Sequence, residues 1–427
     1  MNVLVIGSGG REHALAWKAA QSPDVDRVYV APGNAGTDLE PGIENIAIDS
    51  MDFEGLASFA EANGVGLTIV GPEAPLVEGV VDLFEKRGLR CFGPKAGAAQ
   101  LEGSKAFTKD FLQRHNIPTA AYGNFTELEP ALAYLREQGA PIVVKADGLA
   151  AGKGVIVAET LEQAEEAVTD MLSGNAFGDA GCRVVIEEFL EGEEASFIVL
   201  VDGKNVLPMA TSQDHKRIGE GDTGPNTGGM GAYSPAPVVD DAVHQAIMQQ
   251  VILPTVAGMA AEGNDYTGFL YAGLMIDPDG QPKVIEYNCR FGDPETQPIM
   301  VRLQSDLVAL CNSALDGALD SVEADWDPRC AIGVVLAAGG YPGSYGKGEV
   351  IQGLDTPQAD DIKVFHAGTA SEGGKVVTNG GRVLCVTALG KDIREAQTRC
   401  YAAADHISWT GVTLRRDIGW RAIARYS

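Results

Sequence analysis

The first hundred residues alternate short apolar segments with helical segments, and this alternation restricts the fold more than any other feature of the sequence. Strands are predicted at Asn2–Ile6, Arg27–Val30, Leu67–Val70 and Arg90–Phe92. Helices fit between them, at Glu12–Gln21, Phe53–Asn63 and Val77–Arg87. Strands that alternate with helices form a parallel, doubly wound sheet. We therefore predict an N-terminal α/β domain.

Each predicted strand of this sheet ends in a turn that contains glycine. The turns are GSGG (Gly7–Gly10), PGNAG (Pro32–Gly36), GPEAP (Gly71–Pro75) and GP (Gly93–Pro94). The carboxyl ends of parallel strands share one edge of a sheet, and small ligands bind in the crevice at that edge. The turns therefore favour a small-ligand site, although a simple tight turn between strand and helix is the alternative for GSGG.

The segment GSGGREH resembles a dinucleotide-binding fingerprint but does not satisfy it. The pattern G-x-G-x-x-G requires glycine at position 12, where this chain has Glu12, and no well-placed acid follows about 20 residues later. A helix N-terminus after flexible glycines still suits a phosphate, and Arg11 can add a charge-assisted contact. An NAD-dependent oxidoreductase would rest on these first fifty residues alone.

A second glycine-rich segment, VVKADGLAAGKGV, spans Val143–Val155. It is not a P-loop, because Gly148 and Gly152 are one residue too close, Gly154 replaces Ser or Thr, and a strand follows. Strands at Pro141–Ala146 and Val155–Ala158 instead predict a hairpin, whose tip between Lys145 and Lys153 can donate backbone N–H groups to a triphosphate. The alternative is a flexible hairpin with solvated lysines.

A third segment, KVIEYNCRFGDPE, reads as a strand with period two. Glu286, Asn288 and Arg290 are predicted on one face. The other face is predicted to carry Ile285, Tyr287, Cys289 and Phe291. A carboxylate and an amide oxygen two residues apart can ligate Mg²⁺ beside phosphates, and the arginine can bind a phosphoryl group or a carboxylate. The polar face of a half-exposed strand is the alternative.

The remaining segments predict a small α+β unit inserted in a larger one, followed by a C-terminal domain from about Ala331. Helices are predicted at Lys105–His115, Leu161–Leu172 and Asp392–His406, and strands at Arg183–Phe189, Ala195–Val201 and Phe269–Ile276. Gly219–Ser234 shows no periodicity and is predicted to be a long irregular loop.

Composition excludes several classes of protein. A chain of 427 residues needs two to four domains. A net charge of −27 argues against sequence-independent binding to nucleic acid or to an acidic membrane. Seven scattered cysteines without a CxxC pair predict neither a zinc site nor a disulfide framework. Without a leader segment or a spanning apolar run, we expect a cytoplasmic protein.

The lysine-flanked hairpin, the acidic segment Val184–Phe197 and the Glu-x-Asn strand, in this order, resemble the ATP-grasp superfamily. The strings GSGGREHALAWK, APGNAGT, VGPEAPLV, FGPKAGAAQLEGSK, SQDHKR, DTGPNTGGMGAYSP and NCRFGDPETQ make the chain similar to the phosphoribosylamine–glycine ligase family over essentially its whole length. The resemblance implies an N-terminal domain over 1–102, an ATP-grasp domain over 103–325 with a lid at about 122–192, and a C-terminal α/β domain over 326–427.

The resemblance also implies a reaction and its participants. ATP, with Mg²⁺ or Mn²⁺, would phosphorylate the carboxylate of glycine, and the amine of 5-phosphoribosylamine would attack the acyl phosphate. We expect a monomer that acts on these small molecules. SQDHKR and GPNTGGMG favour this activity over a carboxylating or bicarbonate-activating ATP-grasp enzyme. A non-catalytic nucleotide sensor is a further alternative, but it has no need of Arg290.

Site residues follow from the same resemblance. ATP is expected at Lys105, Lys145, Asp147, Gly152, Lys153, Gly154, Glu187, Glu188, Leu190 and Glu194. The metal is expected at Glu286 and Asn288, and Arg290 would steady the acyl phosphate. Asp214 and Asp293 would hold the glycine ammonium, with Lys216 near the carboxylate. Phosphoribosylamine is expected at Gly9, Gly10, Arg11, Glu12, Gly33, Asn34, Gly71, Pro72 and Glu73. The strand Tyr271–Ile276 offers no acidic side chain, which leaves the ligands of a second ion open.

Overall fold

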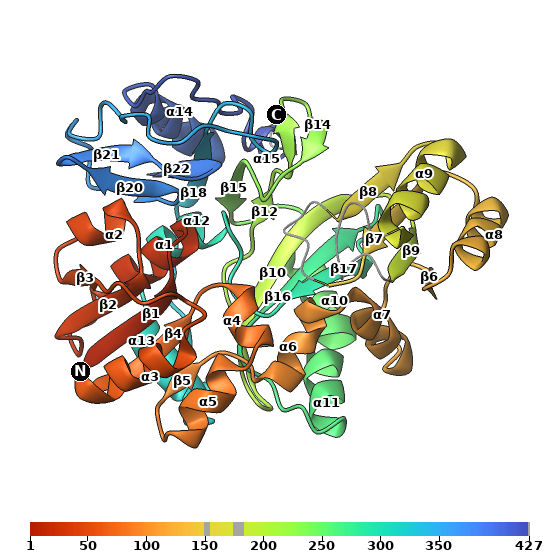
Figure 1. Ribbon diagram of the computed structural model, residues 1–427, viewed down its shortest axis with the longest axis horizontal. Helices are drawn as coiled ribbons and strands as arrows, with labels where there is room; N and C mark the ends of the chain where they lie inside the picture. The colour runs from red at the N-terminus through yellow and green to blue at the C-terminus, as the bar shows by residue number, and fades with distance from the viewer. Residues whose placement is uncertain (149–153, 174–182, 426–427) are drawn as a thin grey trace.

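The structure is a computed structural model, which describes residues 1–148, 154–173 and 183–425. Three parts meet around the centre of the molecule (Figure 1). The N-terminal sheet lies on one side, a lid with two helices lies on the opposite side, and the C-terminal sheet lies above the N-terminal sheet. Within the described residues, no helix is long and apolar enough to cross a membrane.

The N-terminal part is a parallel five-stranded sheet in the order β3-β2-β1-β4-β5, which confirms the predicted fold. The strands are β1 (Asn2–Gly7), β2 (Arg27–Pro32), β3 (Ile43–Asn45), β4 (Val65–Val70) and β5 (Cys91–Phe92). The helices are α1 (Gly10–Ala19), α2 (Ala35–Leu39), α3 (Phe53–Ala62), α4 (Glu73–Val77) and α5 (Val80–Lys86). Leu4 and Val5 pack into separate hydrophobic cores on opposite faces of the sheet. The helix predicted at Val77–Arg87 is wrong at its start, because Gly79, with φ +89°, interrupts it.

The lid is an antiparallel sheet in the order β6-β9-β7-β8. Its strands are β6 (Tyr122–Phe125), β7 (Ile142–Ala146), β8 (Val155–Ala158) and β9 (Val184–Glu188). Helices α8 (Leu128–Gln138) and α9 (Leu161–Leu172) pack on the lid around a small core of their own (Figure 1). Lys145 pairs with Val155 in an antiparallel register, so the predicted hairpin is confirmed. Helices α6 (Ala96–Gly103) and α7 (Lys105–Arg114) connect the N-terminal sheet to the lid.

A larger antiparallel sheet, in the order β11-β10-β16-β17, lies at the centre. Its strands are β10 (Glu193–Asp202), β11 (Val206–Pro208), β16 (Thr267–Ile276) and β17 (Pro282–Asn288), with α10 (Asp241–Ile247) and α11 (Leu253–Ala261) nearby. The turn into β10 requires glycine, because Gly192 has φ +149° and a Cβ there would lie 2.2 Å from the carbonyl oxygen of Ile276.

The predicted strict alternation of β17 is wrong, because a bulge interrupts the strand. Gly273 lies opposite Glu286, whereas the next residue, Leu274, lies opposite Val284. The extra residue, Ile285, changes the faces that follow it. Val284 and Tyr287, three residues apart, are therefore both buried in the same core, while Ile285 stays half-buried.

The C-terminal sheet has the order β12-β15-β18-β22-β19. Its strands are β12 (Gln213–Asp214), β15 (Gly231–Ser234), β18 (Cys330–Ala337), β19 (Ile362–His366) and β22 (Arg382–Gly390), and α14 (Ile393–Ala404) packs against it. The prediction that Gly219–Ser234 is irregular is wrong, since it contains β15 and most of a hairpin between β13 (Arg217–Gly219) and β14 (Thr223–Asn226). Strands from the middle of the sequence thus complete the C-terminal sheet.

Candidate active site

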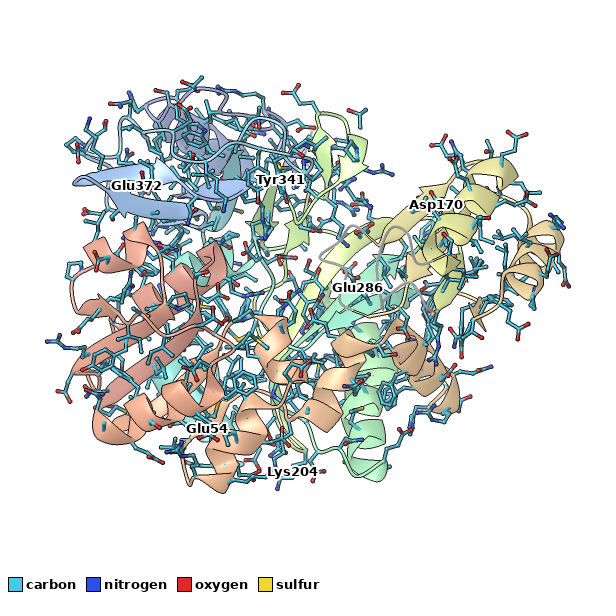
Figure 2. All side chains as sticks on the ribbon, viewed as in Figure 1. Glu54, Asp170, Lys204, Glu286, Tyr341 and Glu372 are labelled. Atoms are coloured by element: carbon cyan, nitrogen blue, oxygen red, sulfur yellow. The ribbon has the colours of Figure 1, made fainter. Side chains whose placement is uncertain are left out.

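One face of the central sheet carries the predicted metal ligand. Ser196 on β10 lies opposite Gly273 on β16, and Gly273 lies opposite Glu286 on β17, so all three share a face. Glycine at position 273 leaves space for the side chain of Glu286, because a Cβ at that position would lie only 3.2 Å from Glu286 Cγ. Figure 2 shows Glu286 near the middle of the molecule, beside the lid. Asn288 follows two residues later, opposite Tyr271.

Lys216, just after β12, joins two of the predicted carboxylates. Its Nζ lies 2.9 Å from Glu194 Oε2 and 3.8 Å from Glu286 Oε1. Burial alone would lower the pKa of Lys216, but Glu194, Asp214 and Glu286 together raise it. For Asp214, burial raises the pKa, whereas the positive charge of Lys216 acts in the opposite direction. The structure therefore brings together predicted residues from β10, β17 and the segment around β12.

The lid lysine Lys145 is held by a buried ion-pair cluster. Its Nζ lies 2.9 Å from Glu187 Oε1 and donates to the carbonyl oxygen of Ile285 at 3.1 Å. Lys109 on α7 approaches Glu187 Oε2 at 2.8 Å, and burial lowers the pKa of Lys109 to about 8. Burial would raise the pKa of Glu187, but the two lysines lower it. Lys109 was not predicted, and its only signal is its position one helical turn after Lys105.

Lys105 and Asp147 connect the lid hairpin to α7. Lys105 Nζ donates to the carbonyl oxygen of Gly148 at 2.7 Å. Asp147 Oδ1 accepts from Ser104 Oγ at 3.1 Å and from the N–H of Ala106 at 3.2 Å, so it satisfies a free donor at the start of that helix. At the other end of the hairpin, Gly154 accepts from the N–H of Ala146. Gly152 and Lys153 lie outside the described residues.

Two further predicted nucleotide contacts lie where the lid meets the central sheet. Glu188, at the end of β9, is exposed, and its Oε2 accepts from the N–H of Ala121 at 3.2 Å. Leu190 is half-buried in the connection to β10. Backbone N–H and C=O groups in this connection can form hydrogen bonds with the edge of an adenine base, as those of an edge strand can.

Arg290 is held by two carboxylates from the N-terminal side. One guanidinium nitrogen lies 2.8 Å from Glu102 Oε1, and another lies 3.4 Å from Glu73 Oε2. Glu102 also accepts from the N–H of Cys289 at 2.7 Å. Burial raises the pKa of Glu102 to about 7, although Arg290 opposes the rise. Glu102 was missed, because a glutamate at the end of α6 carries no motif.

Glu12 fills the space between the first and third glycine turns. Its Oε2 accepts from the N–H of Gly9 at 2.6 Å, and its Oε1 accepts from Arg11 at 2.6 Å. A Cβ on Gly7 would lie 2.4 Å from Glu12 Cγ, and one on Gly71 would lie 2.1 Å from Glu12 Oε1. The carboxylate therefore occupies the place where a dinucleotide pyrophosphate would lie, which gives a physical reason against the NAD alternative.

Asn34 uses its whole side-chain amide to hold the second glycine turn. Its Oδ1 accepts from the N–H groups of Gly36 and Thr37, which caps α2. Its Nδ2 donates to the carbonyl oxygens of Ser8 at 2.8 Å and His366 at 3.0 Å. Asn34 thus connects the first two turns and the C-terminal sheet. Gly33, beside it, needs glycine for its φ of +73°, and Pro72 precedes α4 in the third turn.

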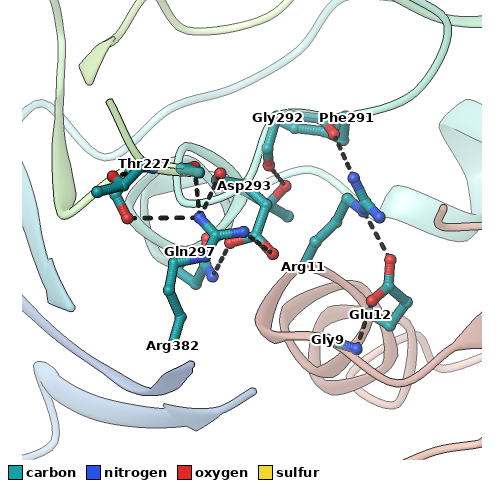
Figure 3. A network of polar contacts seen from close by, with 12 residues as sticks. Gly9, Arg11, Glu12, Thr227, Phe291, Gly292, Asp293, Gln297 and Arg382 are labelled. Atoms are coloured by element: carbon teal, nitrogen blue, oxygen red, sulfur yellow. Dashed lines mark hydrogen bonds and ion pairs between the residues drawn. The ribbon is translucent and has the colours of Figure 1, made fainter. Parts of the chain in front are cut away.

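Arg382 from the C-terminal sheet reaches Asp293 (Figure 3). One guanidinium nitrogen donates to the backbone oxygen of Asp293 at 2.7 Å, and another lies 3.4 Å from its Oδ2. Gln297 donates to Asp293 Oδ1 at 3.1 Å. Burial would raise the pKa of Asp293, but Arg382 and Arg11 lower it. Arg382 was not predicted, because no motif surrounds it.

The residues present fit a divalent ion that arrives with a nucleotide. Within the part of the chain that the structure describes, no group of three His, Cys, Asp or Glu side chains could hold a metal by itself. Mg²⁺ commonly takes one or two protein ligands and completes its shell with phosphate oxygens and water. The oxygens of Glu286 and Asn288 suit that role. Burial would raise the pKa of Glu286, but Lys216 and Lys145 lower it, which keeps the carboxylate ionised.

Comparisons with known proteins agree with this arrangement. Models of the phosphoribosylglycinamide synthetase N domain, ATP-grasp (A) domain and C domain match residues 1–102, 103–296 and 331–421. The phosphoribosylamine–glycine ligases of Vibrio cholerae and Pseudomonas aeruginosa are each 73% identical over 100% of this chain and 99% of their own length.

Solved structures show the same fold. The crystal structure of phosphoribosylamine–glycine ligase from Thermotoga maritima has a TM-score of 0.84 at 34% identity, over 98% of this chain and 100% of that one. Biotin carboxylase from Campylobacter jejuni, at 17% identity and a TM-score of 0.73 over 97% of this chain and 93% of its own, shares the fold alone.

Proposed function

The chain belongs to the phosphoribosylamine–glycine ligase family, and from that premise we propose which of its residues carry the reaction. It is an ATP-dependent ligase of purine biosynthesis that forms a carbon–nitrogen bond between glycine and 5-phosphoribosylamine. Its ATP-grasp domain binds ATP with a divalent metal ion. We propose that this ion is Mg²⁺ or Mn²⁺, and that the enzyme is a cytoplasmic monomer.

Glycine must be activated, because an amine does not displace oxygen from a carboxylate at neutral pH. In the proposed reaction, a carboxylate oxygen of glycine attacks the γ-phosphorus of ATP and ADP leaves. The amine of phosphoribosylamine then attacks the carbonyl carbon of glycyl phosphate, loses a proton, and inorganic phosphate leaves. Lys105 and Lys145 hold the phosphates, and Arg290 stabilises charge that develops on the acyl phosphate. Glu286 and Asn288 hold the metal, which neutralises phosphate charge.

The nucleotide lies between the lid and the central sheet in this proposal. Asp147 and Gly154, the described residues at the two ends of the hairpin tip, lie beside its phosphates. Glu187 acts through Lys145 and Lys109, since its carboxylate pairs with both. The backbone from Glu188 to Leu190 meets the adenine, and Glu194 accepts from the ribose hydroxyls.

The two other substrates lie on the N-terminal side of the phosphates. Lys216 and Arg290 face the carboxylate of glycine, and Asp214 is the better of the two predicted partners for its ammonium, since Asp293 pairs with Arg382. Phosphoribosylamine lies at the edge of the N-terminal sheet, between the three glycine turns. There Glu12 and Glu73 present carboxylates to its hydroxyl or amine groups. Asn34 and Pro72 shape the turns.

We also propose the domain division at residues 1–102, 103–325 with a lid at about 122–192, and 326–427. Strands β12 and β15 are the exception, because they belong to the second segment in sequence and pair with the sheet of the third.

One observation supports the assignment most strongly. Glu286 on β17 lies within reach of Lys216, and the carbonyl oxygen of the preceding residue, Ile285, accepts from Lys145. A metal ligand, a lysine from the lid and a lysine from the β12 segment thus meet at one short stretch of strand.

Substrate-dependent ADP release tests the proposal. ADP is measured with ATP and glycine, with ATP and phosphoribosylamine generated in situ, and with all three. We expect sustained ADP release only with all three. Equal ADP release without glycine would contradict glycine ligation.

A further inference from the structure

The cations around the proposed glycine site already have anionic partners. Arg290 pairs with Glu102, Arg382 pairs with Asp293, and Lys216 pairs with Glu194. Each of these distances is 3.4 Å or less. Each of these three cations therefore has an anionic partner before a substrate arrives.

Glu295, just before α12 (Thr296–Arg302), is a carboxylate without such a partner. Its residue is 3% exposed, and its Oε1 accepts from Ser196 Oγ at 2.9 Å. Across the described ranges 1–148, 154–173 and 183–425, no Lys, Arg or His side chain lies within 4 Å of this carboxylate. A carboxylate offers about four acceptor positions, and burial without a cation is costly. Glu295 therefore has free acceptor capacity for a cationic ligand.

The hydrogen bond from Ser196 fixes this carboxylate above the central sheet. Ser196 Oγ lies 3.0 Å from Tyr271 Oη, so a hydroxyl pair orients the glutamate. Ser196 shares its face with Gly273 and Glu286. The unpartnered carboxylate and the proposed metal ligand are thus on one face, with glycine at position 273 leaving room between them.

Asp214 lies on the same side. Ser196 forms a backbone bridge with Ser212, and Asp214 follows two residues later on the same edge. Burial is the main cause of the raised pKa of Asp214, and the negative charge of Glu295 adds to it. The two carboxyl groups therefore lie close enough to influence each other, and a cation beside them would stabilise the ionised form of both.

We propose that Glu295 binds the ammonium group of glycine, and that Ser196 and Tyr271 orient its carboxylate for that contact. The inference rests on the proposed function, because it assigns a residue to one substrate of that reaction. The ammonium places a positive charge beside Glu295 and Asp214. The carboxylate of glycine then points toward Lys216 and Glu286, where the phosphates lie.

Glycolate provides a probe that separates charge from shape, because a hydroxyl replaces the ammonium of glycine. Binding of both compounds is measured by calorimetry in the full-length enzyme with ADP and Mg²⁺. In Glu295→Gln, we expect the Kd of glycine to rise about tenfold or more, as for the loss of one charge-assisted hydrogen bond. The Kd of glycolate should change less than about twofold. The KM of ATP should not change.

Two further variants test whether the loss of glycine affinity in Glu295→Gln is only a structural effect. Glu295→Asp keeps the charge and should retain more glycine affinity than Glu295→Gln. Glu193 is another carboxylate on β10, and it pairs with Arg425. Glu193→Gln should therefore leave the affinities for glycine and for glycolate unchanged. Equal weakening of glycine and glycolate in Glu295→Gln, or equal losses in the Gln and Asp variants, would overturn the inference.

The outcome also separates this inference from the proposed function. If the wild-type enzyme bound no glycine and released no glycine-dependent ADP, the proposed function would fail. If the wild-type enzyme bound glycine and Glu295→Gln bound it equally well, only the role of Glu295 would be lost.

Discussion

Glu286, the proposed metal ligand, shows how neighbouring charges influence the ionisation of a single residue. Its side chain is 35% exposed, yet Lys216 and Lys145 lower its pKa against the effect of burial. An ionised carboxylate is the ligand that a hard divalent ion prefers. The bulge at Ile285 turns this carboxylate toward Gly273, where the sheet has no side chain in the way.

Replacement of this carboxylate by an amide should affect chemistry more than nucleotide binding. In Glu286→Gln, we expect kcat to fall about 100-fold or more, because charge on the transferring phosphoryl group loses stabilisation. The Kd of ATP should rise only a few-fold, since the lid lysines remain. Steady-state rates and equilibrium ATP binding measure the two effects, with Glu193→Gln as the matched control. A kcat within twofold of wild type would argue against a metal ligand at this position.

The sequence predicts the residues that carry chemistry in a short motif, but not those that act through distant contacts. Glu286, Asn288 and Arg290 follow one another at a spacing of two residues, and that spacing alone indicates a metal and phosphate site, although β17 ends at Asn288 and Arg290 lies just beyond it. Glu102 meets the N–H of Cys289 across 187 positions of sequence. Only the packed structure brings such pairs together, so Glu102, Lys109, Arg382 and Glu295 were not predicted.

At the scale of elements, β12 is a two-residue strand whose position depends on the C-terminal part of the chain. His215 follows it, and its Nε2 accepts from the N–H of Gly419 at 3.2 Å. Burial and the nearby Arg415 lower the pKa of His215 to about 3. The imidazole therefore stays neutral and anchors the segment that carries Asp214 and Lys216.

A buried neutral histidine makes stability depend on pH in a defined direction. The folded pKa of His215 is about 3, below its ordinary value of 6.5. Its contribution is complete above pH 6.5 and is lost as pH falls toward 3, at about 1.4 kcal/mol per pH unit. Between pH 7 and 5, the wild-type unfolding free energy should therefore fall about 2 kcal/mol more than that of His215→Gln, whose amide oxygen can accept from Gly419.

Denaturant unfolding at the two pH values measures this difference. His406→Gln, a change at an exposed histidine, is the matched control and should keep the wild-type pH dependence. An unchanged pH dependence in His215→Gln would contradict the anchoring role of the neutral ring.

The predictability of elements follows the range of their contacts. The strands and helices of residues 1–102 have clear periodicity, and chain order alone indicates their parallel sheet. Strand β15 has four residues and pairs with β18, about a hundred positions later. Such a short strand has no periodic pattern to detect, and its partner is set by tertiary packing.

At the scale of the whole molecule, the N-terminal part, the central sheet region and the C-terminal part each supply a cation to one region, although the net charge is −27. Arg11 lies on α1 beside the N-terminal sheet, Arg290 lies two residues after β17 of the central sheet, and Arg382 begins β22 of the C-terminal sheet. Arg11 and Arg382 appear together in Figure 3. A strongly acidic surface repels phosphates, so this local concentration of cations and backbone donors must provide their binding. The arrangement suits two anionic substrates that meet one small zwitterion.

When glycine is activated as an acyl phosphate, one of its two carboxylate oxygen atoms is transferred to inorganic phosphate. Glycine labelled with ¹⁸O in both carboxylate positions is ligated to phosphoribosylamine, and the inorganic phosphate is examined by mass spectrometry. We predict one labelled oxygen in each phosphate released, because the acyl oxygen that attacked ATP leaves with phosphorus. Phosphate without label, formed while the ligation product accumulates, would contradict glycyl phosphate formation and the site built around Glu286.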